Sequence, residues 1–181
     1  MDRDKKVVIL TEIIAPYRIP VFNKITELYN GEFLVIFLAK AVVGRIWKID
    51  TEKIHFDYAV AKGFAFRRLK SDFFPYLFNP FVFLRLIKLS PDVIIVGSYQ
   101  HPTYFLALFY AKLFKKKFIL WCESHGYGIT EYNCITSSLK KFFIRRCDGY
   151  IVPGKAAYEY ILSFGVKPDR IWKAPNAIDN D

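Results

Sequence analysis

The chain has 181 residues, 53% of them hydrophobic and 18% aromatic, and it carries a formal net charge of +10 at pH 7. This length fits one ordinary domain with a real core, and the composition excludes both a disordered chain and a fibrous repeat. The basic balance favours an anionic partner, although net charge alone does not choose between nucleic acid, an acidic membrane face and a phosphorylated ligand.

Several features of the sequence bear on the cellular compartment. The three cysteines, Cys122, Cys134 and Cys147, are odd in number, and two of them lie in or beside apolar runs. We therefore expect no disulfide framework and a reducing cytoplasm. The N-terminus lacks the apolar core and cleavage site of a signal peptide. The most apolar long stretch, residues 69–89, is interrupted by prolines and charged residues, so we expect no transmembrane span.

Apolar runs bounded by turn residues predict strands that alternate with helices. Residues 7–10 form a continuous β-branched run, which is typical of a strand covered on both faces. Pro20 suits the first turn of the next helix, and Asn79 is expected to cap the helix that starts at Pro80. The expected strands cover residues 7–10, 33–38, 54–60, 93–96, 118–122, 150–152 and 171–173, and the expected helices cover residues 20–28, 81–88, 102–115, 137–146 and 155–164.

This alternation predicts the fold class. Strands joined by helices pair in parallel through right-handed crossovers. We therefore expect an α/β fold with a Rossmann-like, doubly wound parallel sheet in a three-layer α/β/α arrangement. Residues 7–10 and 93–96 should be adjacent central strands of that sheet.

Polar residues follow three of the expected strands. Glu12 comes shortly after the first strand, Ser98 follows residues 93–96, and a loop with Glu123 and His125 follows residues 118–122. In open α/β sheets, ligands bind beyond the carboxyl ends of the strands, where loop backbones and helix N-termini offer NH groups. We therefore expect these loops to line one crevice, which is the candidate site.

Two motifs point to other chemistry but fit it poorly. The segment GYIVPGK at residues 149–155 nearly matches a phosphate-binding loop, yet its strand lies between the glycines and Ala156 replaces the magnesium-binding hydroxyl. We expect Gly154 instead to let a backbone approach another group closely. Cys122 and His125 have ligand-like spacing, but no further ligand pair accompanies them, so we expect no metal site.

The histidines and the basic clusters are compatible with a functional role and also with an ordinary structural one. His125 and His101 both follow strand ends, which favours a functional role, although either is compatible with an ordinary loop histidine. Lysine and arginine clusters are most simply solvated helix ends. Residues 67–88, however, mix cations with aromatic side chains such as Phe73 and Phe78, as in surfaces that sit on anionic lipid.

Four segments in order resemble one family. They are PYRIPVF at residues 16–22, PDVIIVGSYQ at residues 91–100, ESHG at residues 123–126 and GVKPDRIWKAPNAID at residues 165–179. Together they resemble the N-terminal half of a family 4 glycosyltransferase. The resemblance implies the GT-B fold, in which two Rossmann-like domains face each other across a cleft. It also implies a domain at residues 1–175, and residues 176–181 as the start of a linker to a C-terminal, donor-binding domain.

The resemblance further implies the chemistry. Such enzymes transfer a sugar from a nucleotide sugar to a hydroxyl of a glycan or lipid-linked acceptor, usually with retention and with neither a bound metal nor a cofactor. His125 would be the catalytic residue, and Gly154 and Asn176 would face the donor side. Ala177 and Ser98 depart from the glycine and histidine common in the family. The residues implied for acceptor binding are Glu12, Arg18, Ser98, Tyr99, His101 and Glu123.

Two functions from different classes remain open. The first is the acceptor half of a glycosyltransferase of cell-envelope polysaccharide synthesis, which alone would be inactive. Its partners would be a nucleotide sugar, bound through the second domain, and the acceptor. The second is a non-catalytic module that binds an anionic membrane surface or polymer. We expect a cytoplasmic location, with peripheral attachment to the inner face of the membrane as an option, and no nucleic-acid partner. Continuation past Asp181 into a second Rossmann domain would favour the first function.

Overall fold

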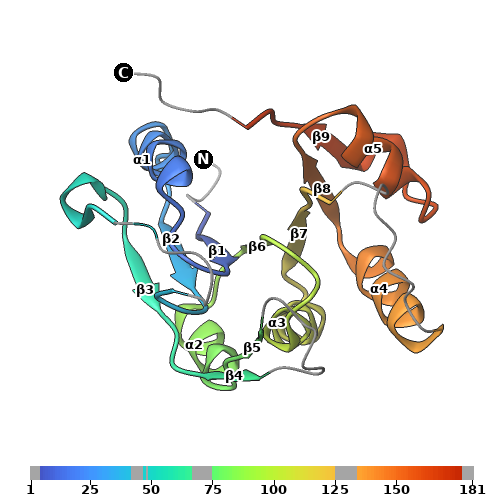
Figure 1. The fold of residues 1–181 in the computed structure, drawn as a ribbon, viewed down its shortest axis with the longest axis horizontal. Helices are drawn as coiled ribbons and strands as arrows, with labels where there is room; N and C mark the ends of the chain where they lie inside the picture. The colour runs from blue at the N-terminus through green and yellow to red at the C-terminus, as the bar shows by residue number, and fades with distance from the viewer. Residues whose placement is uncertain (1–4, 42–46, 48, 67–74, 125–133, 177–181) are drawn as a thin grey trace.

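A computed structural model describes residues 5–41, 47, 49–66, 75–124 and 134–176 of the chain. Seven strands form one sheet in the order β3-β2-β1-β6-β7-β8-β9, and every neighbouring pair is parallel (Figure 1). The strands are β1 (Val7–Thr11), β2 (Phe33–Phe37), β3 (Tyr58–Val60), β6 (Val93–Val96), β7 (Lys117–Trp121), β8 (Gly149–Val152) and β9 (Ile171–Lys173).

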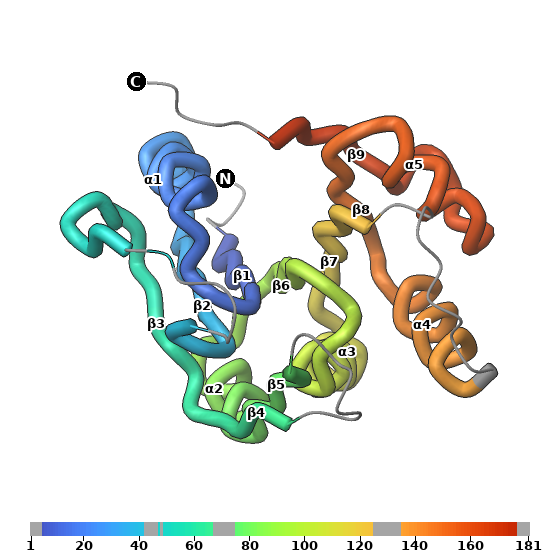
Figure 2. The backbone as a smooth tube through the Cα atoms, viewed as in Figure 1, coloured from blue at the N-terminus to red at the C-terminus, as the bar shows by residue number. Residues whose placement is uncertain are grey.

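The helices lie unequally on the two faces of this sheet. Because parallel crossovers are right-handed, the direction in which the chain moves across the sheet decides which face each helix covers. The chain runs outward from β1 to β3 and then in the opposite direction from β6 to β9, so α1 lies on one face and the other helices on the opposite face (Figure 2). They are α1 (Ile19–Leu28), α2 (Phe81–Leu89), α3 (Pro102–Leu113), α4 (Cys134–Arg146) and α5 (Lys155–Leu162).

Burial follows the same division. One core cluster joins alternate strand residues such as Leu10, Val96 and Leu120 to α2, α3, α4 and α5. A smaller cluster joins the alternate set, for example Ile9 and Trp121, to α1 and the segment around Phe56. Apolar side chains from both surfaces of the sheet are therefore buried, which explains the continuous apolar runs in the sequence.

The predicted fold class is confirmed. Residues 7–10 and 93–96 are adjacent and parallel, in a register that pairs Val7 with Val93 and Leu10 with Val96. All expected strands and helices are present, and most of their ends lie within a few residues of the predicted positions. Ser90, in the left-handed conformation with φ of 46°, follows the last residue of α2, Leu89, which lies one residue beyond the predicted helix.

Three local predictions were wrong. The third strand was expected at residues 54–60, but a 3-10 turn at Thr51–Lys53 precedes it and pairing is confined to residues 58–60. An antiparallel ribbon of β4 (Phe64–Phe66) and β5 (Tyr76–Phe78) was not predicted. Asn79 does not cap α2: the capping position belongs to Pro80, and the Asn79 side chain donates instead to the carbonyl oxygens of Leu38 and Ala61.

Within the described part of the chain, no helix combines the length and the apolar character that crossing a lipid bilayer requires.

Candidate functional site

A polar pocket of about 270 Å³ lies where the strand order reverses, between β1 and β6. We call it the strand-end pocket. Parallel strands bring their carboxyl ends to the same edge, and a reversal of strand order separates the loops there enough to admit a ligand. The structure therefore contains a pocket at the position where the sequence predicted a crevice. It is lined by Thr11, the last residue of β1, and by residues just beyond β1, β6 and β7, including Glu12, Ser98, Tyr99, Gln100, Cys122, Glu123 and Ser124.

The carboxylate of Glu12 lies against the buried ring of His101 in this pocket. The ring of His101 is buried, and its Nδ1 accepts a hydrogen bond from the backbone N–H of Leu77 at 3.2 Å. A neutral imidazole that accepts through Nδ1 carries its proton on Nε2. That Nε2 lies 3.0 Å from Oε1 of Glu12, although the N–H direction falls outside usual hydrogen-bond limits. The Glu12 carbonyl also accepts from the N–H of Ala39, so its backbone is fixed as well.

Arg18 forms a second fixed group at the wall of the pocket. It ends the 3-10 turn Pro16–Arg18 just before α1, and its side chain is buried. Its Nη2 donates to Oε1 of Glu123 at 2.5 Å, and its guanidinium lies 4.6 Å from the centre of the Trp121 ring. Among the described residues, its Nη1 has no hydrogen-bond partner. The ion pair and the aromatic ring thus orient the planar guanidinium, and its Nη1 remains available to donate to a ligand.

Tyr99 and Ser98 make contacts on the other side of the pocket. The hydroxyl of Tyr99 lies 3.1 Å from that of Tyr160 in α5 and 3.5 Å from Oγ of Ser124. Oγ of Ser98 accepts from the N–H of Gln100 at 3.2 Å. These contacts fix the loop after β6 against α5 and against the loop after β7.

Gly97 is a pocket residue that the sequence reading missed. Its N–H donates to the carbonyl of Leu10, which brings the loops after β1 and β6 together. A Cβ at this position would lie 3.1 Å from Oγ1 of Thr11, which is tighter than an ordinary van der Waals contact. The glycine therefore allows the two loops to approach closely. A single glycine directly after a strand was the available signal.

The remaining predicted site residues lie apart from these groups. Gly154 precedes α5, and a Cβ built there meets nothing within 4 Å among the described atoms, so the expected close approach is not seen. Asn176 lines a different pocket, on the sheet face that carries α1. His125 lies outside the described residues. The structure thus brings together Glu12, Arg18, Ser98, Tyr99, His101 and Glu123.

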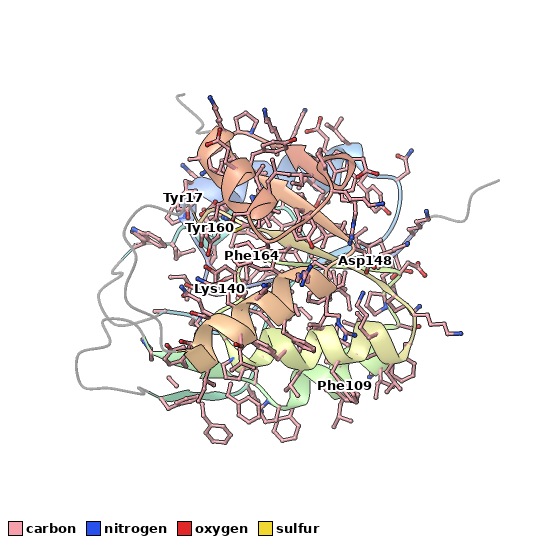
Figure 3. The ribbon with its side chains drawn as sticks, turned by 90° about the vertical axis from the view of Figure 1, so that its right-hand side faces the viewer. Tyr17, Phe109, Lys140, Asp148, Tyr160 and Phe164 are labelled. Carbon is pink, nitrogen blue, oxygen red and sulfur yellow. The ribbon has the colours of Figure 1, made fainter. Side chains whose placement is uncertain are left out.

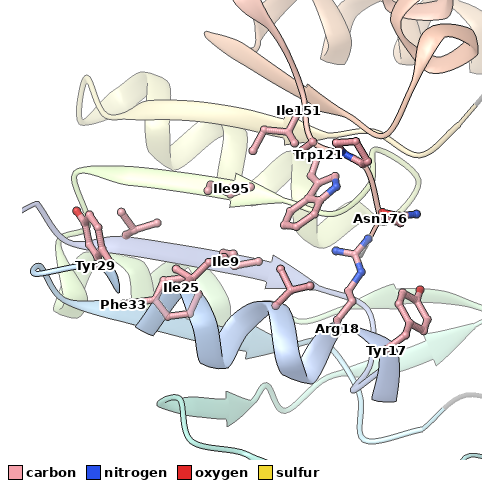
Figure 4. A pocket seen from close by; sticks show the side chains of 14 residues that line it. Ile9, Tyr17, Arg18, Ile25, Tyr29, Phe33, Ile95, Trp121, Ile151 and Asn176 are labelled. Atoms are coloured by element: carbon pink, nitrogen blue, oxygen red, sulfur yellow. The ribbon is translucent and has the colours of Figure 1, made fainter. Parts of the chain in front are cut away.

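A second pocket, of about 300 Å³, lies on the sheet face that carries α1 (Figure 4). We call it the sheet-face pocket. Apart from Arg18 and Asn176 its lining is apolar, with Ile9, Ile95 and Trp121 from the strands. Arg18 belongs to both pockets, and Figure 4 shows its guanidinium directed towards Asn176. The pocket exists because the crossovers from β6 to β9 place their helices on the opposite face.

Cys122 is a buried core residue at the edge of the strand-end pocket. Burial raises the pKa of its thiol to about 11, although hydrogen bonding to Ser124 acts in the opposite direction. A thiol with this pKa is protonated at neutral pH, whereas nucleophiles and metal ligands are thiolates. Cys122 therefore contributes packing to the pocket wall. Cys147 is likewise buried.

A family model described as Glycosyltransferase Family 4 matches residues 45–181. Comparison with curated proteins returned no match.

Solved structures share the fold. HepE of Anabaena, in complex with UDP and glucose, aligns with a TM-score of 0.66 at 11% identity, over 97% of this chain and 45% of that chain. The lipopolysaccharide outer core galactosyltransferase WaaB, in its apo form, aligns with a TM-score of 0.55 at 15% identity, over 97% and 47%. UDP-GlcNAc 2-epimerase from Methanocaldococcus jannaschii gives a TM-score of 0.58 at 13% identity, over 94% and 45%. The chain spans less than half the length of each.

Proposed function

Because the chain belongs to glycosyltransferase family 4, we propose that it binds the acceptor in an enzyme that transfers a sugar from a nucleotide sugar to a hydroxyl group. The acceptor is a glycan or a lipid-linked sugar, and the transfer retains the configuration at the anomeric carbon. The described sheet is one Rossmann-like half of the family's GT-B fold. A second Rossmann-like domain supplies the nucleotide-sugar site, and residues 176–181 lead towards it.

The observation that carries this proposal is the fixed carboxylate of Glu12 in the strand-end pocket. Sugars are recognised through hydroxyl groups, and a carboxylate accepts hydrogen bonds from two of them at once. Because the Glu12 carboxylate already lies against the His101 ring and the Glu12 carbonyl is bonded to the N–H of Ala39, binding loses little side-chain entropy. The pocket volume of about 270 Å³ suits a ligand of about one sugar ring.

The other pocket residues have complementary roles. Glu123, braced by Arg18, accepts from a further acceptor hydroxyl. Ser98 and Tyr99 supply neutral hydroxyl groups that both donate and accept. The unpaired Nη1 of Arg18 is a donor for a ligand oxygen at the boundary between the two pockets. His125 contacts the reacting hydroxyl from the loop after β7.

The reaction divides between the two halves of the enzyme. Departure of the nucleoside diphosphate develops negative charge, which preorganised donors stabilise. Gly154, at the start of α5, and Asn176 lie on the donor side in this proposal. In a retaining transfer the leaving phosphate takes the acceptor proton, so Glu12 and His125 position the acceptor hydroxyl and need not accept its proton.

The fold alone does not choose this reaction. UDP-GlcNAc 2-epimerases share it with TM-scores similar to those of the transferases. The family match over residues 45–181 is what favours transfer. An epimerase acts on a single nucleotide sugar, whereas a transferase also needs a site for the acceptor, as the strand-end pocket offers.

NMR titration of the labelled chain with methyl glycosides of glucose, galactose and N-acetylglucosamine tests the proposal. At least one glycoside should shift the backbone resonances of Gly97, Ser98 and Gln100, and Glu12→Gln should abolish the shifts. The matched control is Glu27→Gln, which changes an exposed carboxylate on α1 and should leave them unchanged. The proposal is wrong if UDP-glucose binds this chain tightly while every glycoside leaves these resonances unmoved.

A further inference from the structure

The outer surface of α2 and α3 is unusually apolar. Surface helices of globular proteins place polar side chains on the face away from the core. In α2 the residues that point away from the sheet include Phe81, Leu84 and Ile87, which are 63%, 60% and 44% exposed. In α3 they include Phe109 and Leu113, which are 60% and 57% exposed. We call the outer surface of these two helices the α2–α3 face.

These side chains form one surface because the two helices pack side by side. The Phe83 ring of α2 stacks on the Phe109 ring of α3, with ring centres 5.9 Å apart. Figure 3 shows α2 and α3 along the lower edge of the molecule, where Phe109 is labelled and side chains project outward. Single exposed apolar residues are ordinary, but a continuous patch of aromatic and aliphatic side chains marks an interaction surface.

The charge on this face has one sign. Neither helix contains an acidic residue, and Asp92 is the one acidic residue in the sequence between residues 73 and 122. Asp92 itself lies beside the ammonium of Lys116, at 3.7 Å. Among the cations of the face are Arg85 and Lys88 in α2. Exposed apolar side chains on helices that carry cations and no acids complement a layer of anionic headgroups over an apolar interior.

We propose that the α2–α3 face docks on the surface of an anionic lipid bilayer. The sequence suggested residues 67–88 for this role, but residues 67–74 lie outside the described part and Phe78 is half-buried. Residues 81–88 of that segment belong to α2, so the structure keeps this part of the predicted surface and adds α3 to it. This proposal goes beyond sugar transfer and rests on other residues than the strand-end pocket.

The position of α3 links the surface to the pocket. Ser98, Tyr99 and Gln100 line the strand-end pocket just before α3, and the Phe109 side chain of α3 is exposed on the outer surface. A helix with its side chains is about 10 Å across. A bilayer against the outer side of α3 therefore lies within about one helix diameter of the layer that holds the pocket, which places an acceptor carried by a lipid close to Glu12.

Co-sedimentation of the chain with vesicles tests the proposal. The probes are phosphatidylcholine vesicles with and without phosphatidylglycerol. The chain should sediment with the vesicles that contain phosphatidylglycerol, and rising salt should release it, because the attraction is screened beyond the Debye length. Equal sedimentation with neutral and anionic vesicles overturns the proposal.

A pair of apolar variants locates the surface. Replacing three exposed apolar residues of the face by serine should abolish sedimentation, whereas the same number of replacements at exposed positions elsewhere should not change it. Circular dichroism and thermal melting confirm that each variant is folded. The variants are Phe81→Ser, Leu84→Ser and Phe109→Ser for the face, and Leu28→Ser, Ile135→Ser and Trp172→Ser for the control.

Two variants that each remove two positive charges test the proposal independently if the serine variant fails to fold. Arg85→Gln with Lys88→Gln should lower the partition coefficient about 30-fold, from about fivefold for each cation near the surface. Lys24→Gln with Lys155→Gln makes the same change in net charge on α1 and α5 and should leave the coefficient unchanged. If both pairs lower it equally, the attraction comes from net charge and the proposed face is wrong.

Light scattering separates the proposal from self-association. If the chain is a dimer that the serine variant converts to a monomer, and neither form binds vesicles, the face is an interface between two copies and the proposal is overturned.

Discussion

The sheet-face pocket and the strand-end pocket are built from the same three strands, yet one is lined by apolar and the other by polar side chains. The sheet-face pocket is lined by residues within β1, β6 and β7, such as Ile9, Ile95 and Trp121. The strand-end pocket is lined by residues that follow the same strands, such as Glu12 and Ser98. A side chain within a strand of this sheet is covered by packed layers and is therefore apolar. A side chain just past the end of the strand is not covered in this way and can be polar. Position along the strand therefore decides the chemistry.

The two pockets also arise from different causes. The sheet-face pocket follows from the handedness of the crossovers, which leaves part of one face without a helix from the described chain. The strand-end pocket follows from the reversal of strand order and carries oriented charged groups. We therefore expect residues of the first to govern stability and residues of the second to govern binding, with Arg18 involved in both.

The largest expected effect is on stability, from a variant of the sheet-face pocket. Ile9 is 1% exposed, so Ile9→Ala should lower the free energy of unfolding by about 2–5 kcal/mol, because it loses buried surface and leaves a cavity. Urea denaturation measures this loss. Glycoside binding by the folded protein should stay unchanged. Ile95→Ala, in the same pocket but only partly buried, should cost less.

A pH effect tests whether Cys122 belongs to the core and not to the binding groups. Its pKa is raised by burial from 9.0 to about 11, so between these values the folded protein keeps a proton that the unfolded chain loses. Stability is then complete below pH 9 and falls as the pH rises to 11, by up to about 2.7 kcal/mol. Burial also raises the pKa of Cys147, which adds to the slope. Denaturation curves at several pH values give the unfolding free energy, which should fall less with rising pH in Cys122→Ala than in the unchanged chain. An unchanged slope contradicts this assignment.

The strand-end pocket should respond in activity with little change in stability. In a protein that carries this chain with its donor domain, Glu12→Gln should lower kcat/KM by about 10- to 100-fold, the value of a hydrogen bond to a charged group. The variant keeps the size of the side chain and should change the unfolding free energy by less than about 1 kcal/mol. Comparable losses in both quantities would place Glu12 with the structural residues.

The smallest expected effect is at Arg18, which lines both pockets. Arg18→Lys keeps the charge but loses the planar fork and its stacking on Trp121. We expect glycoside affinity to fall about fivefold and unfolding free energy to fall by about 1 kcal/mol. The stability loss is small because the Glu123 side chain is 36% exposed and solvent screens the pair. A change in only one of the two measurements would assign Arg18 to a single pocket.

Much of this arrangement could be predicted from the sequence, because buried parallel strands read as continuous apolar runs and their ends converge. That reasoning placed Glu12, Ser98 and Glu123 around one crevice. It could not find the contact between His101 and the N–H of Leu77, because the three-residue strands β4 and β5 are too short to show a period. The role of His125 stays a prediction.

The sheet-face pocket and the role of Asn79 were missed for a different reason. The pocket depends on which face each crossover covers, which no local pattern reveals. The cap predicted at Asn79 was a local signal overridden by tertiary partners, since its backbone N–H donates to Oγ1 of Thr103.

The buried amide of Asn79 should make the β4–β5 ribbon resist local opening more than its position outside the main sheet suggests. The ribbon lies outside the main sheet, where segments usually open first and exchange their amide protons fastest. Asn79 joins it to Leu38 after β2, to Ala61 and to Thr103 in α3, and its amide lies so close to Gly63 that no side chain fits there. Lifting the ribbon away exposes these bonds together, at the cost of buried polar groups left unpaired. We therefore expect the ribbon and the start of α3 to open as one unit, and the contact between His101 and Glu12 to be lost when that unit opens.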